Sequence, residues 1–465
     1  MTGLTRARTA GLAIGAVVAA ASVAAVVALV AFELPGHTAP TISLSAQPPA
    51  AASVATCAGP ILATGRDSTQ AGFLADAAAQ QIVQGAGDGA EAERDTLAAV
   101  DVPGGSGPEV FTAQPVDGAR TDLAAAGSAS VDDTDLRGFA ASACVRAQME
   151  SWLVAGSGTT GAADVILLAN PGDVPALVSL SVYGAAGLVE PPAGSGIVVA
   201  PGAQRVIPLA SLALGEENPI VRVTSQQAPV QASVQTSLTR VLLPGGVDQI
   251  AAVGAPESSL VIPGVRVTLA PGDPGASDVP TSLRLLAPAA AGTATVTIIG
   301  QAGQVGEARV VPLTAGVPLQ LDLDGLPVGT YTVRVASTTP VTGAVWSTTG
   351  FGAGSDFGWF TGAGVLAEPT LVAVASGPSP VLVLASDEGA DQVVTVSDAD
   401  GQSAREVAVP AGGSVEVTVD AGVFLVTPGA PGIRVGVSYA GAGAIAGYPV
   451  RPGDAAAAAI LVYPR

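Results

Sequence analysis

The stretch of this 465-residue sequence that decides the fold is Asp324-Gly-Leu-Pro-Val-Gly-Thr-Tyr331-Thr-Val-Arg-Val335. The Asp-Gly pair favours a turn. From Tyr331 to Val335, large apolar residues alternate with polar ones. Such alternation places successive side chains on opposite faces of a strand, so the stretch predicts a turn that leads into a half-buried β-strand.

The pattern around this stretch occurs three times after residue 145. Each copy opens with an apolar strand, continues with an alternating strand and a glycine turn, and closes with two more alternating strands. The opening strands are 165–169, 282–286 and 381–385, the second strands are 177–182, 294–299 and 392–396, and the turns lie at Gly187, Gly303 and Gly401. Short alternating strands separated by Gly/Pro turns are typical of a β-sandwich, so the sequence predicts an all-β fold with tandem sandwich repeats.

The domain plan follows from these repeats. We expect a cytoplasmic tail at 1–9, a transmembrane signal-anchor at 10–32, a Pro/Ala-rich stalk at 33–56 and an irregular N-terminal module at 57–144, in which 71–83 has a helical pattern. The three sandwich repeats are expected at 145–247, 248–355 and 356–465. The segments that begin at Glu150, Asp248 and Asp356 share an acid followed by apolar residues and Gly, which suggests a recurrent edge strand.

Residues 10–32 form an uncharged apolar run, and Arg6 and Arg8 precede it. A helix of that length reaches about 34 Å, enough to cross a hydrocarbon core of about 30 Å. The flanking arginines place the N-terminus in the cytoplasm and the bulk of the chain outside. A cleaved signal peptide is the alternative, because small residues fill the run and leave room for a cleavage site.

The composition excludes several kinds of chemistry. The chain has no lysine, and its one histidine, His37, lies in the expected stalk. Ser-His-Asp, Cys-His and lysine-based catalysis therefore have no candidate residues in the expected folded part. His- or Cys-based zinc sites are excluded by count. An enzyme would have to use carboxylates, so no catalytic residue and no cofactor is assigned.

The exported part is acidic, with all 38 Asp and Glu residues against 16 of the 18 arginines. A surface of this charge repels nucleic acid, so nucleic-acid partners are not expected. The segments 132–135, 322–325 and 398–401 carry closely spaced aspartates, but none has a full calcium-binding loop. We interpret them as turns and assign no metal site.

Cys57 and Cys144 are the only cysteines, and both lie in the exported part. An even number of cysteines in an oxidising compartment favours a disulfide. This bond would tie the start of the folded region to a point nearly 90 residues later.

Five of the chain's 16 aromatic residues lie within 15 positions. They are Trp346, Phe351, Phe357, Trp359 and Phe360. An aromatic face on a sandwich can stack on sugar rings or bury a protein partner. The alternative is that these rings pack the joint between the second and third repeats, as Trp152 would do at the first junction.

The stretch around Tyr331 resembles the strand entry of bacterial immunoglobulin-like domains, in which a Tyr packs back over the corner before the strand. Phe424 in the third repeat keeps the ring, and Ile220 in the first does not. The whole layout is similar to that of an uncharacterised family of actinobacterial single-pass envelope proteins. That resemblance implies a location in the cell membrane and no mechanism.

Three functions remain open. The first is a membrane-anchored structural or interaction protein of the cell envelope, without catalytic activity, whose partner is an envelope protein. The second is a cell-wall glycan-binding protein that uses the aromatic residues between Trp346 and Phe360. The third is a carboxylate-based glycoside hydrolase.

Overall fold

The computed structural model describes residues 4–31, 44–46, 49–66, 72–87, 89–269, 279–387, 389–452 and 460–462. The chain divides into two units, one made of residues 1–49 with 457–465 and the other of residues 50–456. His37 and most of the expected stalk lie outside the described residues. In the first unit, helix α1 (Leu4–Ala31) is followed by β1 (Leu44–Ala46), which pairs with β35 (Ile460–Val462).

Helix α1 contains the predicted apolar run. Residues Ala10–Ala28 are long and apolar enough to cross a membrane, and none of their side chains is buried. A signal sequence has the same properties, so both alternatives named above remain.

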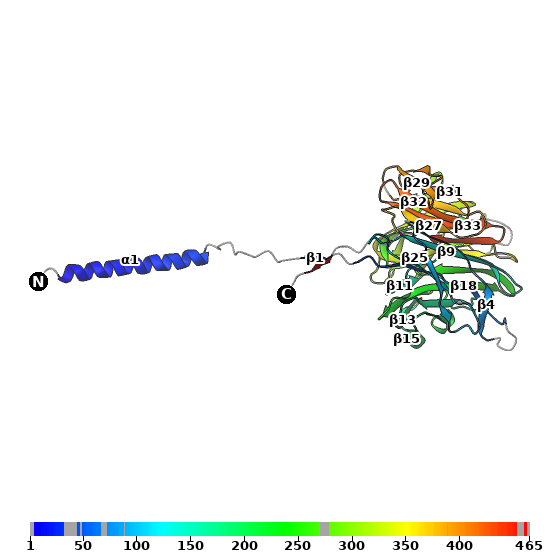
Figure 1. Ribbon diagram of the computed structural model, residues 1–465, viewed down its shortest axis with the longest axis horizontal. Helices are drawn as coiled ribbons and strands as arrows, with labels where there is room; N and C mark the ends of the chain where they lie inside the picture. Colours follow the sequence, from blue (N-terminus) through cyan, green and yellow to red (C-terminus); the bar gives the residue numbers. More distant parts are fainter. Residues whose placement is uncertain are drawn as a thin grey trace. The chain divides into compact units, whose positions relative to one another are not determined.

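The second unit is built from strands, as predicted, and the all-β fold class is confirmed (Figure 1). Its N-terminal module contains β2 (Ser53–Thr56), β3 (Ile61–Thr64), β4 (Leu74–Ala78), β5 (Gln81–Ala86), β6 (Glu93–Thr96), β7 (Ala98–Ala99), β8 (Glu109–Ala113), β9 (Leu123–Asp132) and β10 (Arg137–Ala143). The helical pattern predicted for 71–83 is wrong. Strand pairing overrides the helix propensity of this alanine-rich segment, because β4 pairs with β3 and β5 pairs with β9.

The rest of the unit repeats one strand plan three times. The first repeat contains β11 (Glu150–Leu153), β12 (Val165–Asn170), β13 (Ala176–Gly184), β14 (Gly187–Val189), β15 (Ile197–Val199), β16 (Ala203–Pro208), β17 (Ile220–Gln226), β18 (Gln231–Arg240) and β19 (Leu243–Ala251), with short 3-10 helices at Pro192–Gly194 and Leu209–Ser211. The second contains β20 (Glu257–Val267), β21 (Thr281–Leu286), β22 (Gly292–Gly300), β23 (Gly303–Leu313), β24 (Leu319–Asp322), β25 (Gly329–Thr348) and β26 (Phe357–Thr361). The third contains β27 (Thr370–Val374), β28 (Val381–Ser386), β29 (Gln392–Asp398), β30 (Arg405–Val409), β31 (Ser414–Thr418), β32 (Gly422–Pro428), β33 (Ile433–Gly441) and β34 (Ala444–Pro449).

The pairing is the same in each repeat. The opening apolar strand lies between two partners, which are β16 and β18 for β12, β24 and β25 for β21, and β31 and β33 for β28. The alternating strand that follows pairs in the other sheet, β13 with β17, β22 with β25 and β29 with β32. In the second repeat the long strand β25 serves both sheets. In Figure 1, β29 and β31 of the third repeat and β13 and β15 of the first lie at opposite ends of the unit.

The predicted tyrosine corner is present. Tyr331 lies near the start of β25, and its hydroxyl donates to the carbonyl of Pro327, 2.8 Å away. The ring lies against the core that includes Val333 and Val335. The hydrogen bond fixes the chain where it turns into the strand, which explains why the stretch quoted first predicts this corner.

The last strands of the four modules meet at one place, which we call the central junction. It consists of β10, β19, β26 and β34. β10 packs against β19 and β34, and β26 packs against the same two strands. Each junction strand pairs with the strand before it in its own module, β9, β18, β25 or β33. The segments that begin at Asp248 and Asp356 are thus edge strands by pairing, and they complete the sheets of the preceding repeat.

Asp356 joins all four strands of the central junction. The residue directly precedes β26, and its carboxylate accepts backbone N–H groups of Phe139 in β10 (2.9 Å), Val247 in β19 (3.2 Å) and Ile445 in β34 (3.3 Å). Burial raises the pKa of Asp356 to about 8, and the backbone donors oppose that shift. Nearby, Asp248 accepts the N–H of Trp359 at 2.7 Å.

Glycine allows the strands to approach this closely. A Cβ atom on Gly138 would lie 2.5 Å from an oxygen of Asp356 and 2.7 Å from the backbone nitrogen of Val247. Gly246 also has no room for a side chain, because its Cβ would lie 2.6 Å from the Phe357 ring. The junction therefore depends on glycine at both positions.

The predicted disulfide is present between Cys57 and Cys144, 87 positions apart. It lies in a small core with Ala55, Phe111 and Ala125. The bond links the end of β2 to the segment that follows β10, so it ties the outer part of the N-terminal module to its junction strand.

Candidate functional site

The predicted aromatic residues lie on the β25–β26 hairpin and its loop. Trp346 in β25 is directly opposite Trp359 in β26, and Phe357 lies two positions before Trp359 on the same face. Phe351 lies in the connecting loop. Strand alternation turns Phe360 to the other face, where it packs in the core of the second repeat. The structure therefore brings four of the five rings together.

The four rings line a cleft of about 580 Å³, which we call the aromatic cleft. The first repeat contributes Asp164 and Arg240, among other polar residues, and the second contributes Arg284 and Gln320. Phe357 and Trp359 also belong to the hydrophobic core of the first repeat. These four rings therefore pack at the joint between the first and second repeats. Phe360 alone packs where the sequence suggested, because it shares its core with Ile445 of the third repeat. Pairing is the physical reason, since β26 completes the second repeat.

The rings divide into buried and accessible ones. Phe357 and Trp359 are 3% and 6% exposed, so they hold the joint. Trp346 and Phe351 are half-buried. The Trp346 ring lies 6.2 Å from that of Phe357, and the guanidinium of Arg240 lies 4.8 Å from the centre of the Phe351 ring. Trp346 and Phe351 thus form the accessible floor of the aromatic cleft.

Beneath the accessible rings, Arg284 links the second repeat to the first. It is buried, and it donates to the carbonyls of Gly156 (2.8 Å) and Pro219 (3.1 Å) and to Oδ1 of Asn218 (2.9 Å). Its guanidinium lies 4.7 Å from the centre of the Trp359 ring. Burial lowers the pKa of Arg284 to about 9, and the charge of Asp164 acts in the opposite direction. Arg284 therefore crosses from the second repeat to hold the backbone of the first.

Asp164 is the buried acid of the aromatic cleft. One carboxylate oxygen accepts the N–H of Ser157 at 2.7 Å, and the other accepts the N–H of Ser237 at 2.8 Å. Burial raises the pKa of Asp164 to about 7, while these two amides oppose the rise. Because both oxygens hold backbone, the geometry assigns Asp164 to fixing the loop beside the cleft.

Sequence reasoning did not single out Asp164, Arg240 or Arg284. A signal for Arg284 was present, because it is the lone charge in the apolar strand 282–286. Asp164 likewise directly precedes the apolar strand 165–169. Their role depends on which repeats touch, and local sequence does not encode that.

The aspartate segments considered for calcium are turns. Gly401 donates its N–H to the carbonyl of Asp398 at 2.9 Å, and Gly325 has a positive φ of 73°. In the β9–β10 turn, Asp133 and Asp135 each form an ion pair with Arg66, at 3.0 and 3.1 Å. Within the described ranges, no group of three or more His, Cys, Asp or Glu residues is arranged to hold a metal ion.

Residues 98–420 match the model of a protein family described as "Family of unknown function (DUF5719)". The match begins in the N-terminal module and runs through most of the third repeat. No curated protein matches the chain. A solved structure titled "Biofilm associated protein - BSP domain" aligns at 9% identity over 91% of this chain and 100% of that one, with a TM-score of 0.12.

Proposed function

This chain belongs to the DUF5719 family of unknown function, and for it we propose a role as a membrane-anchored interaction protein of the cell envelope without catalytic activity. The observation that carries the proposal is the use of the buried charges. Asp164 and Asp356 accept hydrogen bonds from backbone groups, and Arg284 donates to two backbone carbonyls and the Asn218 side chain, so all three join modules or fix loops. Buried charges used in this way hold the modules firmly together, and we infer that they serve the structure rather than a reaction.

Helix α1 supplies the anchor in this proposal. Its apolar segment, Ala10–Ala28, has the length of a membrane span, and Arg6 and Arg8 precede it. The acidic bulk of the chain then lies outside the cytoplasm, where the Cys57–Cys144 disulfide is stable.

The anchor is tested by expressing the full chain with a C-terminal tag and washing the membranes at alkaline pH. We expect the tagged chain to stay in the membrane at its full mass, 44.9 kDa plus the tag, and to be accessible to external protease. A shortened chain released into the soluble fraction would show that the segment is a cleaved signal, and the anchor would be wrong.

Glycan binding is the second candidate function, and the aromatic cleft favours it. Trp346 and Phe351 present accessible ring surface beside polar side chains, and the volume of about 580 Å³ lies in the range of small-ligand sites. Apolar faces of sugar rings stack on such aromatic surfaces, while hydroxyl groups need polar partners of the kind that Gln320 and Arg240 provide.

The test is binding of the full chain to isolated cell-wall polysaccharide. A polyoxyethylene detergent keeps the helix soluble without adding sugar. We expect Trp346→Ala to weaken binding about tenfold, the scale of one lost aromatic contact. The matched control is Phe424→Ala, which removes another half-buried ring far from the cleft residues in sequence. Equal binding by wild type and Trp346→Ala would rule out the aromatic cleft as a glycan site.

The carboxylate-based hydrolase is the third possibility, and its test is direct. Asp164, Glu217 and Asp322 are the acids that line the aromatic cleft. Because Asp164 holds backbone through both oxygens, we propose that the cleft does not hydrolyse glycosides. Turnover of a glycoside panel that disappears in Glu217→Gln would contradict this and establish an enzyme.

A further inference from the structure

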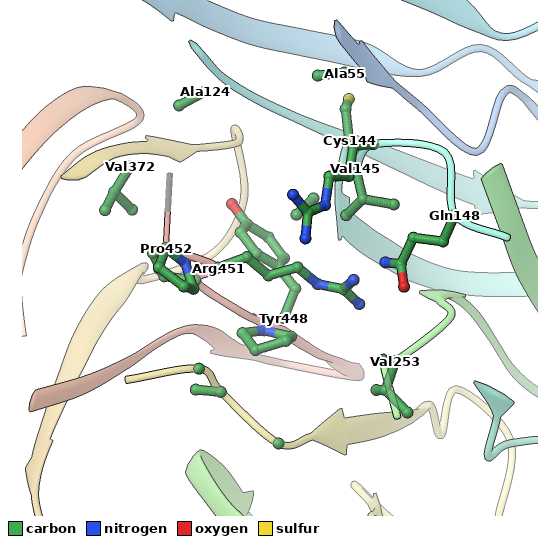
Figure 2. Close-up of a pocket in the computed structure, with 18 of the residues that line it drawn as sticks. Ala55, Ala124, Cys144, Val145, Gln148, Val253, Val372, Tyr448, Arg451 and Pro452 are labelled. Atoms are coloured by element: carbon green, nitrogen blue, oxygen red, sulfur yellow. The ribbon is translucent and has the colours of Figure 1, made fainter. Parts of the chain in front are cut away.

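The polar groups of the two largest clefts are used differently. A second cleft of about 350 Å³ lies where the N-terminal module meets all three repeats, and Figure 2 shows Gln148, Tyr448 and Arg451 around it. The Tyr448 hydroxyl donates to the carbonyl of Ala373 at 3.0 Å. Arg451 donates to the carbonyl of Ala252 and, at 3.2 Å, to the amide oxygen of Gln148. These groups stabilise the fold, whereas the aromatic cleft contains polar groups that lack such partners.

Three residues of the aromatic cleft form a row across the sheet of the second repeat. Ser282 in β21 lies directly opposite Asp322 in β24 on one side and Trp346 in β25 on the other. Residues that are directly opposite on neighbouring strands point to the same face, and all three line the cleft. Two strand spacings place the backbones of Asp322 and Trp346 about 10 Å apart. The small side chain of Ser282 between two larger ones makes a slot, which we define by these three residues.

The polar groups of the slot have no partners in the part of the chain that the structure describes. Ser282 is only 6% exposed, and its hydroxyl makes no hydrogen bond there. The side chain of Asp322 is exposed, and its carboxylate makes neither a hydrogen bond nor an ion pair with another described residue. The nearby Arg309 donates instead to the backbone carbonyl of Asp322, at 2.6 Å. A nearly buried hydroxyl without a partner costs free energy, which a bound ligand can restore.

The other charged groups of the aromatic cleft are engaged within the protein. Asp164 and Arg284 hold backbone groups, as described above. The guanidinium of Arg240 lies 4.8 Å from the centre of an aromatic ring. Burial lowers the pKa of Arg284, and the negative charge of Glu217 is one of the charges that oppose this fall. Among the described residues that line the cleft, Asp322 is therefore the charged group that remains for a ligand, and its charge is negative.

We propose that the slot binds a glycan through an amino sugar whose amine is free and protonated. This inference rests on the glycan-binding role proposed above for the aromatic cleft. The sugar ring stacks on Trp346, and its ammonium group lies over Ser282 and donates to the hydroxyl oxygen and to the carboxylate of Asp322. The indole ring also attracts a cation. The net charge of −20 on the chain favours a cationic sugar and opposes an acidic one.

The experiment compares two oligosaccharides of equal length, a glucosamine oligomer with free amines and its N-acetylated form. Calorimetry measures their binding to the full chain in polyoxyethylene detergent, in slightly acidic solution so that the amines are protonated. We expect the glucosamine form to bind about tenfold more tightly, and salt to reduce this preference, because the ammonium forms a charged hydrogen bond. Asp322→Asn should abolish the preference, whereas Trp346→Ala should weaken the binding of both forms.

The matched control is Asp324→Asn, which removes an exposed acid close by that does not line the cleft and should keep the preference. Thermal unfolding without ligand verifies that both aspartate variants fold. The inference is wrong if wild type binds the two forms equally, if Asp322→Asn keeps the preference, or if Asp324→Asn also loses it. Equal binding that Trp346→Ala weakens would leave glycan binding in place, whereas no binding of either form or of cell-wall polysaccharide would overturn both proposals.

Discussion

Asp356 places one carboxylate among strands that belong to four modules. Its oxygens accept N–H groups from β10, β19 and β34 while its own backbone leads into β26. Both oxygens of a carboxyl group keep acceptor lone pairs, whether or not the group is ionised. An amide cannot accept all of these donors, because its NH₂ group would face a backbone N–H. The identity of this residue therefore controls whether the four junction strands stay together.

We expect Asp356→Asn to lower the free energy of unfolding by about 2–4 kcal/mol, since at least one buried backbone N–H loses its acceptor. Urea unfolding of the full chain followed by tryptophan fluorescence measures the change. Asp400→Asn is the control, because it replaces an exposed turn acid and should change stability by less than about 0.5 kcal/mol. A value for Asp356→Asn equal to that of the control would contradict the role assigned to Asp356.

The buried acids predict how stability depends on pH. Burial raises the pKa of Asp164 to about 7 and that of Asp356 to about 8, and it raises the pKa of Asp248 well above its usual range. Above about pH 4 the unfolded chain has released these protons, whereas the folded chain still holds them. The unfolded state therefore binds fewer protons, and stability falls as pH rises toward these values.

We expect the free energy of unfolding to fall between about pH 6 and pH 8, by up to about 1.4 kcal/mol per pH unit for each carboxyl that is still protonated. Urea unfolding at a series of pH values measures the trend, with His37→Asn as the control for the single histidine. Stability that is constant or rises over this range would show that the buried acids are ionised in the folded state.

The sequence predicted some of these single-residue features. It marked Asp248 and Asp356 as acids that begin similar segments, and it paired Cys57 with Cys144 correctly. It did not predict what the acids hold. The donors to Asp356 come from Phe139 and Ile445, and their approach depends on packing between modules rather than on neighbouring residues.

At the scale of elements, alternation and glycine turns predicted the strands of the repeats well, because a strand buried on one face repeats every two residues. The turn glycines Gly187, Gly303 and Gly401 all have positive φ. The same reasoning failed at 71–83, where alanine and glutamine favour a helix in isolation and pairing with β9 decides the outcome. It also placed all five aromatic rings between the second and third repeats, whereas four of them lie at the joint between the first and second.

The junction strands supply the prediction at this scale. We expect Gly138→Ala to lower the free energy of unfolding by about 1–3 kcal/mol, because its methyl group would overlap an oxygen of Asp356 and force the strands apart. Gly352→Ala is the matched control, since a Cβ there meets nothing within 4 Å. Differential scanning calorimetry on both variants measures the difference, and equal midpoints would mean that β10 has room to move.

At the scale of the whole molecule, the acidic composition and the absence of lysine predicted the classes of function to exclude, and the repeats predicted the sandwich plan. Neither predicted that the modules of residues 50–456 share one junction. Tandem repeats in a sequence suggest modules that fold separately. In the structure, however, β10 contacts β34, although the two strands lie far apart in the sequence. Composition cannot encode such a contact.

Because the modules share the central junction, we expect them to unfold together. Removal of the Cys57–Cys144 bond by a double substitution to serine should lower the free energy of unfolding by about 4 kcal/mol, the scale for a loop of this length. Because the N-terminal module contributes β10 to the junction, we expect one calorimetric transition at a lower temperature. A separate early transition for the N-terminal module would contradict a common unit.

The closed contact of β10 with β34 also sets an order of assembly. A ribosome completes β10 long before it makes residues 444–449, so the first module must wait, with one flank uncovered, until nearly the whole chain has been synthesised. Early contacts are therefore provisional, and the last strand completes them. A nascent chain that stops before β34 is expected to be a target for proteases and chaperones. The presence of this strand therefore distinguishes complete chains from truncated ones.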